Sequence, residues 1–470
     1  MSNLTQELAS FAVDTKYEDL PVSVVHEAKL LLLDSIGCAL AAITTDKGKM
    51  SLALARRLGG PPESSIIGMG GKVSCSSAAL ANGELICTLD FDVLTAGGHA
   101  TPFIIPPSLA VAENIGAPGK DLILATSLGY EVSARVAGAV QQPNGGFEGP
   151  EWEKFSWGER NGQAHFNFGA AAGAGKLLKL DRDKMLNALG IAGHLCKVLT
   201  QVRYTFSAHR YLNKYEVPGW QNTGAVMAVL LAEMGYIGDT TVLDPEHGFW
   251  KFCGYGGWHP DKIMEGLGKT WIFTGAHYKQ YPTCGMFHTA LDCLYSIIDR
   301  NNLMPGDIES IKAFCHPTVE QPCFTNREVS NIVDAQFNPA YVFAVAAHRV
   351  RIGVEWQDLD TMRNPEILEF GKRITCQGHP QFGKQRQKDP SSSLSKVEVV
   401  AKGKTFTEER THPKGTSGTD VQMTDEELVE KFRHNASRIL AQDKIENAVN
   451  SLLNLEKLKN ISELMKQITL

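Results

Sequence analysis

Two aspartates and a histidine, Asp90, Asp92 and His99, lie within one short stretch of the chain. The preceding segment, 76–89, has the apolar spacing of a helix, and the glycine pair 97–98 comes directly before the histidine. A carboxylate beside an imidazole orients the ring and tunes its pKa, so the stretch could carry out proton transfer with a ligand. The alternative is that Asp92 caps the helix end and His99 is a turn residue; the local spacing favours neither interpretation.

A second histidine, His165, precedes a segment rich in glycine and alanine, 167–178, which predicts a closely packed helix. The unpaired N–H groups at a helix N-terminus attract anions, so a histidine there could help to bind a carboxylate. The alternative is a histidine that only caps the helix. The glycine run does not predict a nucleotide site, because Leu177 stands where a phosphate loop needs serine or threonine.

Basic residues gather in the segment before a predicted helix at 220–234. They are Arg203, His209, Arg210 and Lys214, and together they could form a cationic cluster that matches carboxylates. A solvated run of charges is the alternative, and this segment taken alone favours that alternative.

Lys279 and Tyr281 precede Pro282 at the start of a predicted helix, 285–298, where Lys279 could point into a cleft between domains. The chain contains no G-x-S-x-G serine motif, no H-E-x-x-H metal motif and no C-x-x-C pair. We therefore expect no cofactor and no metal. Acids, histidines and lysines without a cofactor suit proton removal from carbon beside a carboxylate, with cations stabilising the negative charge that develops.

Composition narrows the partners of the protein. The formal net charge of -6 gives no general attraction for nucleic acid or for an anionic membrane. No apolar run reaches the roughly 18 residues of a membrane-spanning helix, and no signal-peptide pattern opens the chain. The 10 cysteines are scattered, which argues against a disulfide framework. We expect a cytoplasmic globular protein that binds neither nucleic acid nor membrane.

Helical patterns dominate the first half of the chain and return at its end. Helices are predicted at 21–40, 47–58, 108–114, 120–139, 182–194, 339–351, 428–440 and 444–455, and strands at 270–274, 308–315, 396–401 and 404–410. Residues 68–72 predict a hairpin turn and 380–395 a loop. The fold class is mainly α with a smaller α+β domain. A large all-α helical domain is built from both chain ends, 1–268 and 413–470, and an α+β lid domain, 269–412, is inserted between them.

Several sequence blocks, in this order and spacing, resemble the MmgE/PrpD family. They lie at 33–38, 82–102, 176–181, 246–249, 279–282 and 334–341 and span nearly the whole chain. The resemblance implies a helical domain with an α+β lid, a homodimer, and an active site between the domains. It also implies a cofactor-independent lyase or isomerase, since the family includes 2-methylcitrate dehydratase, cis-aconitate decarboxylase and iminodisuccinate epimerase.

The residues and the resemblance together predict a site. Its catalytic residues are Asp90, His99, His165, Lys214 and Lys279, and its substrate-binding residues are Thr95, Arg203, His209, Arg210 and Tyr281. In this scheme His99 or His165 is the acid or base, Asp90 orients a histidine, and the lysines clamp the substrate. The stretch from Asp90 to His99 is one residue shorter than in the animal decarboxylases, so Thr95 matches the family threonine only after the gap is shifted.

The predicted substrate is a small di- or tricarboxylate. Among the possible reactions we prefer dehydration, with decarboxylation and epimerisation as alternatives, because all three pass through a carbanion beside a carboxylate and could use the same residues. Two other classes of function stay open at this point: a catalytically silent carboxylate-binding protein and a metal-dependent hydrolase.

Overall fold

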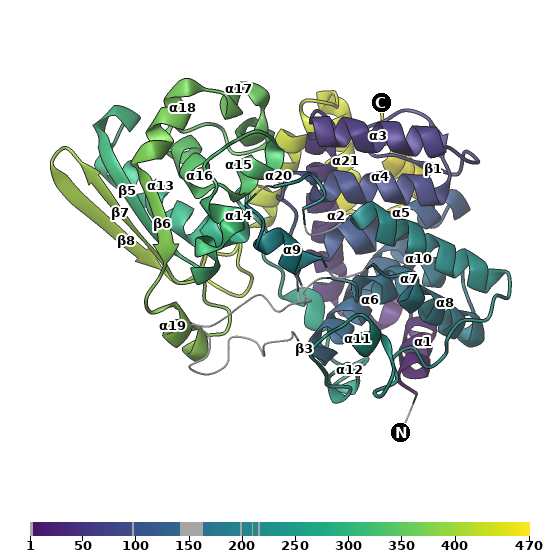
Figure 1. The fold of residues 1–470 in the computed structure, drawn as a ribbon. Coiled ribbons are helices and arrows are strands. Elements are labelled where there is room, and N and C mark those ends of the chain that lie inside the picture. Colours follow the sequence, from purple (N-terminus) through teal and green to yellow (C-terminus); the bar gives the residue numbers. More distant parts are fainter. Residues whose placement is uncertain (1–2, 96–97, 142–162, 198–199, 209, 215–216) are drawn as a thin grey trace.

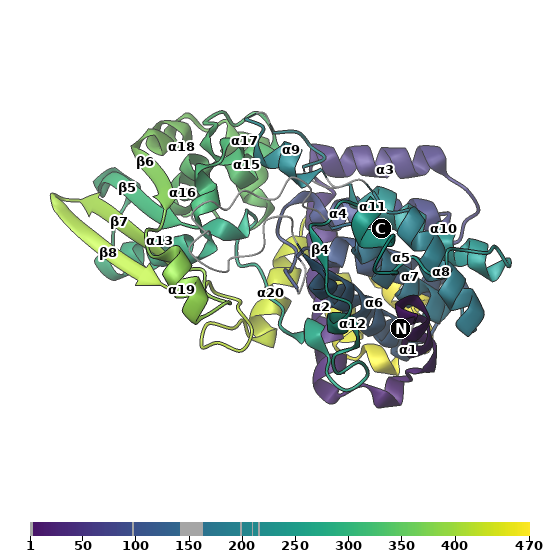
Figure 2. The ribbon, with the colours of Figure 1, turned by 60° about the horizontal axis from the view of Figure 1, so that its bottom comes forward.

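The computed structural model describes residues 3–95, 98–141, 163–197, 200–208, 210–214 and 217–470 (Figure 1). Helices form most of it, and strands are few and gathered in small sheets, so the predicted fold class is confirmed. The helical part lies on one side of Figure 1 and the sheet-containing part on the other, and the turned view in Figure 2 keeps the two apart.

The helical part begins with α1–α12, of which α9 lies against the other part of the chain, where its Tyr204 joins the core of that part. Their bounds are α1 Leu4–Asp14, α2 Val22–Ala42, α3 Asp46–Leu58, α4 Cys75–Thr88, α5 Thr101–Ile115, α6 Gly119–Ala139, α7 Phe166–Leu177, α8 Arg182–His194, α9 Gln201–Thr205, α10 Pro218–Glu233, α11 Phe249–Phe252 and α12 Asp261–Met264. Three C-terminal helices, α20 Asp425–Ala436, α21 Gln442–Leu453 and α22 Ser462–Gln467, return to this side, where α20 and α21 pack against α2.

Close packing of α7 against α6 explains the run of small residues in α7. A methyl group added at Gly169 would lie 2.0 Å from the carbonyl oxygen of Gly129. Because real side chains cannot approach that closely, only glycine permits this helix contact. The prediction of close helix packing is thus confirmed.

The other part of the chain contains a four-stranded sheet in the order β6-β5-β7-β8. The strands are β5 Ile308–Cys315, β6 Ile374–Gly378, β7 Ser395–Ala401 and β8 Lys404–Arg410. β5 and β6 run parallel, whereas β7 and β8 form the predicted hairpin, whose turn residues Lys402 and Gly403 both have positive φ. The helices of this part are α13 His288–Asn301, α14 Pro322–Thr325, α15 Ile332–Phe337, α16 Pro339–Ala347, α17 Leu359–Met362, α18 Pro365–Phe370 and α19 Phe382–Lys388.

Two hydrophobic cores underlie the two parts. The first joins apolar side chains of the N-terminal helices to those of the C-terminal helices, for example Leu31 and Phe432. The second joins the sheet to its covering helices, for example Ile311 and Leu291. Two short strand pairs lie outside the four-stranded sheet and contribute Val73 and Val140 to the first core: β1 Ser64–Ser65 with β2 Lys72–Val73, at the predicted hairpin, and β3 Val140–Gln141 with β4 Gly257–Trp258.

The strand prediction at 270–274 is wrong. This segment contains the 3-10 helix η3, Ile272–Thr274, and its backbone groups bond to side chains of α6 instead of to a neighbouring strand. The Glu131 carboxylate accepts from Ile272 N at 2.8 Å, and Arg135 Nη2 donates to Thr270 O at 2.8 Å. A buried ion pair on one helix therefore satisfies the backbone that a sheet would otherwise pair.

The loop prediction at 380–395 is wrong in part, because α19 occupies its first half. Phe382 at the start of this helix is buried, and its ring centroid lies 4.6 Å from that of His316. That apolar contact anchors a segment whose composition is otherwise that of a loop. Strand β6 was not predicted; it is short and only one of its residues, Ile374, is fully buried.

Among the residues described, no single helix is long and apolar enough to cross a membrane. The bent pair α2 and α3, which meet at 96°, passes the test of length and composition together.

Candidate active site

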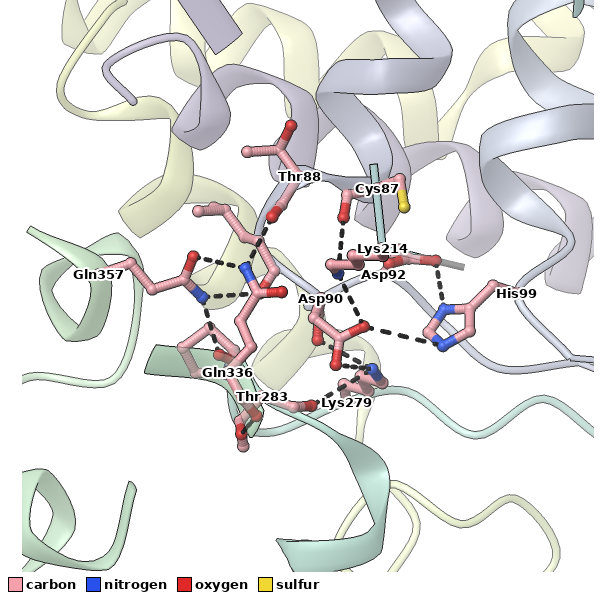
Figure 3. Close-up of polar contacts among 12 residues, drawn as sticks. Cys87, Thr88, Asp90, Asp92, His99, Lys214, Lys279, Thr283, Gln336 and Gln357 are labelled. Atoms are coloured by element: carbon pink, nitrogen blue, oxygen red, sulfur yellow. Dashed lines mark hydrogen bonds and ion pairs between the residues drawn. The ribbon is translucent and has the colours of Figure 1, made fainter. Parts of the chain in front are cut away.

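Asp90 lies just beyond the C-terminal end of α4, and two lysines hold its carboxylate. Lys214 Nζ is 3.2 Å from Oδ1, and Lys279 Nζ is 3.2 Å from Oδ2 (Figure 3). All three side chains are at most 2% exposed. The chain brings them together from the end of α4, the segment before α10 and the segment after η3.

The charges of this cluster stabilise one another. Burial raises the pKa of Asp90, but the opposing effects of Lys214, Lys279 and His99 outweigh burial and bring it far below the usual value. Burial likewise lowers the pKa of Lys214, and Asp90 more than offsets that effect, so the net shift is upward. Asp90 is therefore an anion and Lys214 a cation at neutral pH.

His99 is held by Asp92, whose Oδ2 lies 2.9 Å from Nδ1 of the ring and also accepts from Thr101 Oγ1 at 3.3 Å. Burial raises the pKa of Asp92, and His99 reverses the shift, so this carboxyl is ionised too. An ionised carboxylate only accepts, so Nδ1 carries the proton of this bond. The other nitrogen, Nε2, lies 3.9 Å from Asp90 Oδ1. The sequence assigned the orienting role to Asp90; in the structure Asp92 makes the direct bond.

A cavity of about 560 Å³ opens in front of His99, between the helical part and the sheet-containing part. On the helical side it is lined by Leu94, Gly98, His99 and Gln163; on the other side it is lined by Cys284, Met286, Phe324, Phe337 and Arg386, among others. His99 reaches this cavity, whereas Asp90 and its two lysines lie behind the ring, outside the lining. The geometry suits His99 for proton exchange with a ligand in the cavity, with the ion-pair cluster directly behind its ring.

His277 lines the same cavity and was missed by the sequence analysis. Its backbone pairs with Leu94, and its Nδ1 lies 3.2 Å from Thr416 Oγ1. Burial, and then the positive charges of Lys279 and Lys431, lower the pKa of His277 to about 3, so its ring is neutral at physiological pH. The sequence feature that could have identified His277 is its position two residues before Lys279.

His165 is buried at the start of α7 and does not line the cavity. Its Nδ1 lies 3.1 Å from the Tyr255 hydroxyl, and burial lowers its pKa to about 3. Within the described part of the chain, its Nε2 has no hydrogen-bond partner. A catalytic role for His165 stays a prediction.

The predicted substrate-binding residues lie in different places. Arg210 is buried and donates to Asp334 at 2.9 Å and to Cys323 O at 2.6 Å, so it joins the two parts of the chain. Tyr281 donates to Asp292 at 2.7 Å. Arg203 is exposed, the backbone of Thr95 pairs with that of Gly98 beside the cavity, and His209 lies outside the described residues. None of the four described residues is part of the cavity lining.

Comparison with known proteins agrees with the predicted resemblance. The MmgE/PrpD N-terminal domain matches residues 6–260, and the MmgE/PrpD C-terminal domain matches residues 281–456. The chain is 24% identical to the cis-aconitate decarboxylase-like protein oryM of Aspergillus oryzae, over 99% of this chain and 97% of that protein. It is 25% identical to a cis-aconitate decarboxylase of Aspergillus terreus (99% and 96% covered) and 23% identical to that of Homo sapiens (99% and 94%). The chain belongs to the MmgE/PrpD family.

Proposed function

We propose that this protein is a lyase that acts on a small polycarboxylate by proton transfer at carbon, with cis-aconitate decarboxylation as the leading reaction. The observation that carries the proposal is the Asp92–His99 pair, whose ring lines the cavity with Nε2 beside the carboxylate of Asp90. The names of the relatives, which cover almost the whole chain, favour decarboxylation among the reactions that this pair could serve.

In this mechanism the bond between carbon and one carboxylate breaks, and carbon dioxide leaves. The electron pair stays on the carbon chain, where the substrate's own double bond and remaining carboxylates delocalise it. Protonated His99 then delivers its Nε2 proton to one of the carbons that share this electron pair, and the double bond takes its final position accordingly. Asp92 orients the ring through Nδ1 and Asp90 lies beside Nε2, while Lys214 and Lys279 keep Asp90 ionised.

Dehydration, which the sequence analysis preferred, stays a prediction that one assay separates from decarboxylation. With carbon-13-labelled cis-aconitate, decarboxylation converts one labelled carboxylate to carbon dioxide and bicarbonate, which carbon-13 NMR detects. A hydro-lyase running in reverse instead adds water and produces a hydroxy acid with all carboxylates retained. If the carbon-13 label appears neither in carbon dioxide and bicarbonate nor in a hydroxy acid, the protein catalyses neither reaction on this substrate.

Arg386 of α19 supplies a cation to the far wall of the cavity. Its Nη1 donates to Ser392 O at 2.9 Å, and burial lowers its pKa without removing its charge at neutral pH. A cation in a cavity lined largely by apolar side chains suits a carboxylate of the substrate.

We therefore expect Arg386→Gln to raise KM about 10-fold, as the loss of one charged hydrogen bond does. Steady-state kinetics should show a much smaller change in kcat, because in this proposal Arg386 binds a carboxylate of the substrate and takes no part in the proton transfer. Arg327→Gln is the matched control, since that arginine bonds to Gly371 O and Ile374 O and does not line the cavity. Equal KM values for the two variants would exclude the assigned role of Arg386.

The homodimer also belongs to this proposal. Large apolar side chains are exposed on α3, on α10 and directly after α10, and both helices pack against α4: Met50, Leu54, Leu58, Trp220, Met227 and Met234. On α3 they recur every four residues and so form one stripe. A second copy of this chain would remove that surface from water.

Light scattering should therefore give twice the chain mass of 51.3 kDa for the native protein. The double variant Trp220→Asp with Met227→Asp should give the monomer mass, because two charges would be buried in the contact. Met304→Asp, at a side chain that is 65% exposed beside the sheet, should leave the dimer intact. A monomeric native protein at micromolar concentration would refute the dimer.

A further inference from the structure

The last turn of α4 ends in a row of carbonyl groups that receive bonds from side chains far away in the sequence. Helix C-terminal carbonyls have no partner within the helix and need capping from outside. Here Cys87 O accepts from Lys214, Thr88 O from Gln336 and Leu89 O from Gln357; Asp90 O accepts from Lys279 and Phe91 O from Lys431. Each consecutive carbonyl from 87 to 91 is thus held by a different distant side chain (Figure 3 shows the first four).

Gln357 joins this turn to the segment that carries Lys279. Its Nε2 donates to Leu89 O at 2.8 Å and to Pro282 O at 2.9 Å, while its Oε1 accepts from Gln336 at 2.8 Å. The side chain is buried, so its polar atoms depend on these partners. One amide therefore bridges the two segments on which the Asp90 cluster is built.

Lys431 of α20 bridges the same two segments at a second point. Its Nζ donates to Phe91 O at 2.9 Å and to Lys279 O at 2.9 Å, and it pairs with Asp34 Oδ1 at 2.7 Å. The ammonium also lies 3.8 Å from the centroid of the Phe91 ring. An ammonium has three N–H donors, and these three partners use all of them.

The backbone between the two bridges needs such support. Asp90 has a φ of 54°, in the left-handed region that costs a residue other than glycine free energy. Leu89 and Phe91, whose carbonyls Gln357 and Lys431 hold, are its two chain neighbours. The bridges thus fix the strained residue from both sides and set the direction in which its carboxylate, and that of Asp92, points.

We propose that Gln357 and Lys431 are positioning residues that hold the segments around Asp90 and Lys279 in the geometry for proton transfer by His99. This inference rests on the proposed function. Neither side chain lines the cavity, so each acts through the backbone of the residues that it joins.

The test compares Gln357→Met and Lys431→Met with the native protein. We expect kcat on cis-aconitate to fall between about 10- and 100-fold in each variant with KM within about threefold, because a small misplacement near the chemistry has effects of that size. Hydrogen exchange followed by mass spectrometry should show faster amide exchange at 87–95 and 277–284. Lys431→Arg, which keeps the charge and donors, should recover part of kcat.

Lys29→Met is the matched control. Lys29 lies on α2, and its Nζ likewise contacts both a carbonyl, Leu453 O at 2.8 Å, and a carboxylate, that of Glu456 at 3.1 Å. This variant should leave kcat and the exchange at 87–95 unchanged. Since Lys431→Met leaves Asp34 buried without its cation, the double variant Asp34→Asn with Lys431→Met provides a second test if the single variant fails to fold. Its expected loss of kcat is the same.

Two results would overturn the inference: native kcat despite faster exchange, or lowered kcat with native exchange at both segments. The first result would show that the exact position of the two segments does not affect turnover. The second would show that Gln357 and Lys431 affect turnover without holding these segments in place. If the native protein turns over none of the substrates, the proposed function fails. The hydrogen-exchange measurement then still decides whether the two side chains hold the segments 87–95 and 277–284 in place. Native exchange rates in both variants would refute that positioning role.

Discussion

Replacing Asp90 by asparagine is expected to abolish turnover and to lower the free energy of unfolding by about 3–5 kcal/mol, the range seen when one partner of a buried ion pair is removed. Asparagine nearly preserves the shape but leaves Lys214 and Lys279 buried without their shared anion. Urea denaturation measures the stability and the cis-aconitate assay the turnover. Asp239→Asn, which breaks an exposed contact with His194, should cost less than about 1 kcal/mol.

The pH dependence of the Asp90→Asn effect follows from the sign of the shift. The pKa of Asp90 is lower in the folded protein than the value of about 3.9 in an unfolded chain. The ionised carboxylate therefore stabilises the fold fully above the unfolded pKa, and the stabilisation is lost as the pH falls toward the folded pKa. We expect the stability difference between native protein and variant to be constant from pH 6 to about pH 8 and to shrink in acid. A difference that disappears near neutral pH would contradict the ion-pair cluster.

Replacing His99 by glutamine is expected to lower kcat by at least about 100-fold, the usual contribution of a general acid or base. Glutamine is polar and similar in size, and the ring that it replaces is 13% exposed at the cavity wall, so the melting temperature should change little. Steady-state kinetics and thermal melting of the same preparation check both expectations.

His165→Gln is the comparison that identifies the acid. Both histidines were predicted to be catalytic, but His99 lines the cavity and His165 does not. Native-like turnover in His99→Gln together with a large loss of turnover in His165→Gln would identify His165 as the proton donor. Native-like turnover in both variants would remove histidine acid catalysis from the mechanism.

Local sequence patterns predicted many elements of the fold correctly. Strand β5 was predicted with its observed bounds. The helix predicted at 428–440 is also present, although α20 begins three residues earlier, where Thr424 and Glu427 form a capping box. The strand prediction at 270–274 was wrong because distant residues decide the structure there. The apolar composition of this segment suits a strand, but Glu131 and Arg135, well over a hundred residues away, take its backbone bonds.

The same limit applies to the site. Asp90 and His99 were found because reactive residue types lie close together in the sequence. Lys214 stood out in a run of basic residues and Lys279 before a predicted helix, and the family resemblance then implied a catalytic role for both. Gln357 and Lys431 have no local signal, since a glutamine in a short 3-10 helix and a lysine on an amphipathic helix are ordinary surface patterns. Only the tertiary contacts reveal that these two side chains are buried against the turn that carries the acids.

Proton NMR in deuterated water tests the central claim most directly. The purified protein is incubated with cis-aconitate, citrate, 2-methylcitrate and iminodisuccinate, and the His99→Gln variant serves as the control. We predict that the native protein forms a product from cis-aconitate that has one carboxylate fewer and deuterium on a carbon that shared the electron pair, and that the variant does so at least about 100-fold more slowly. The absence of product and of deuterium exchange with every substrate, in protein shown to be folded, would contradict the account.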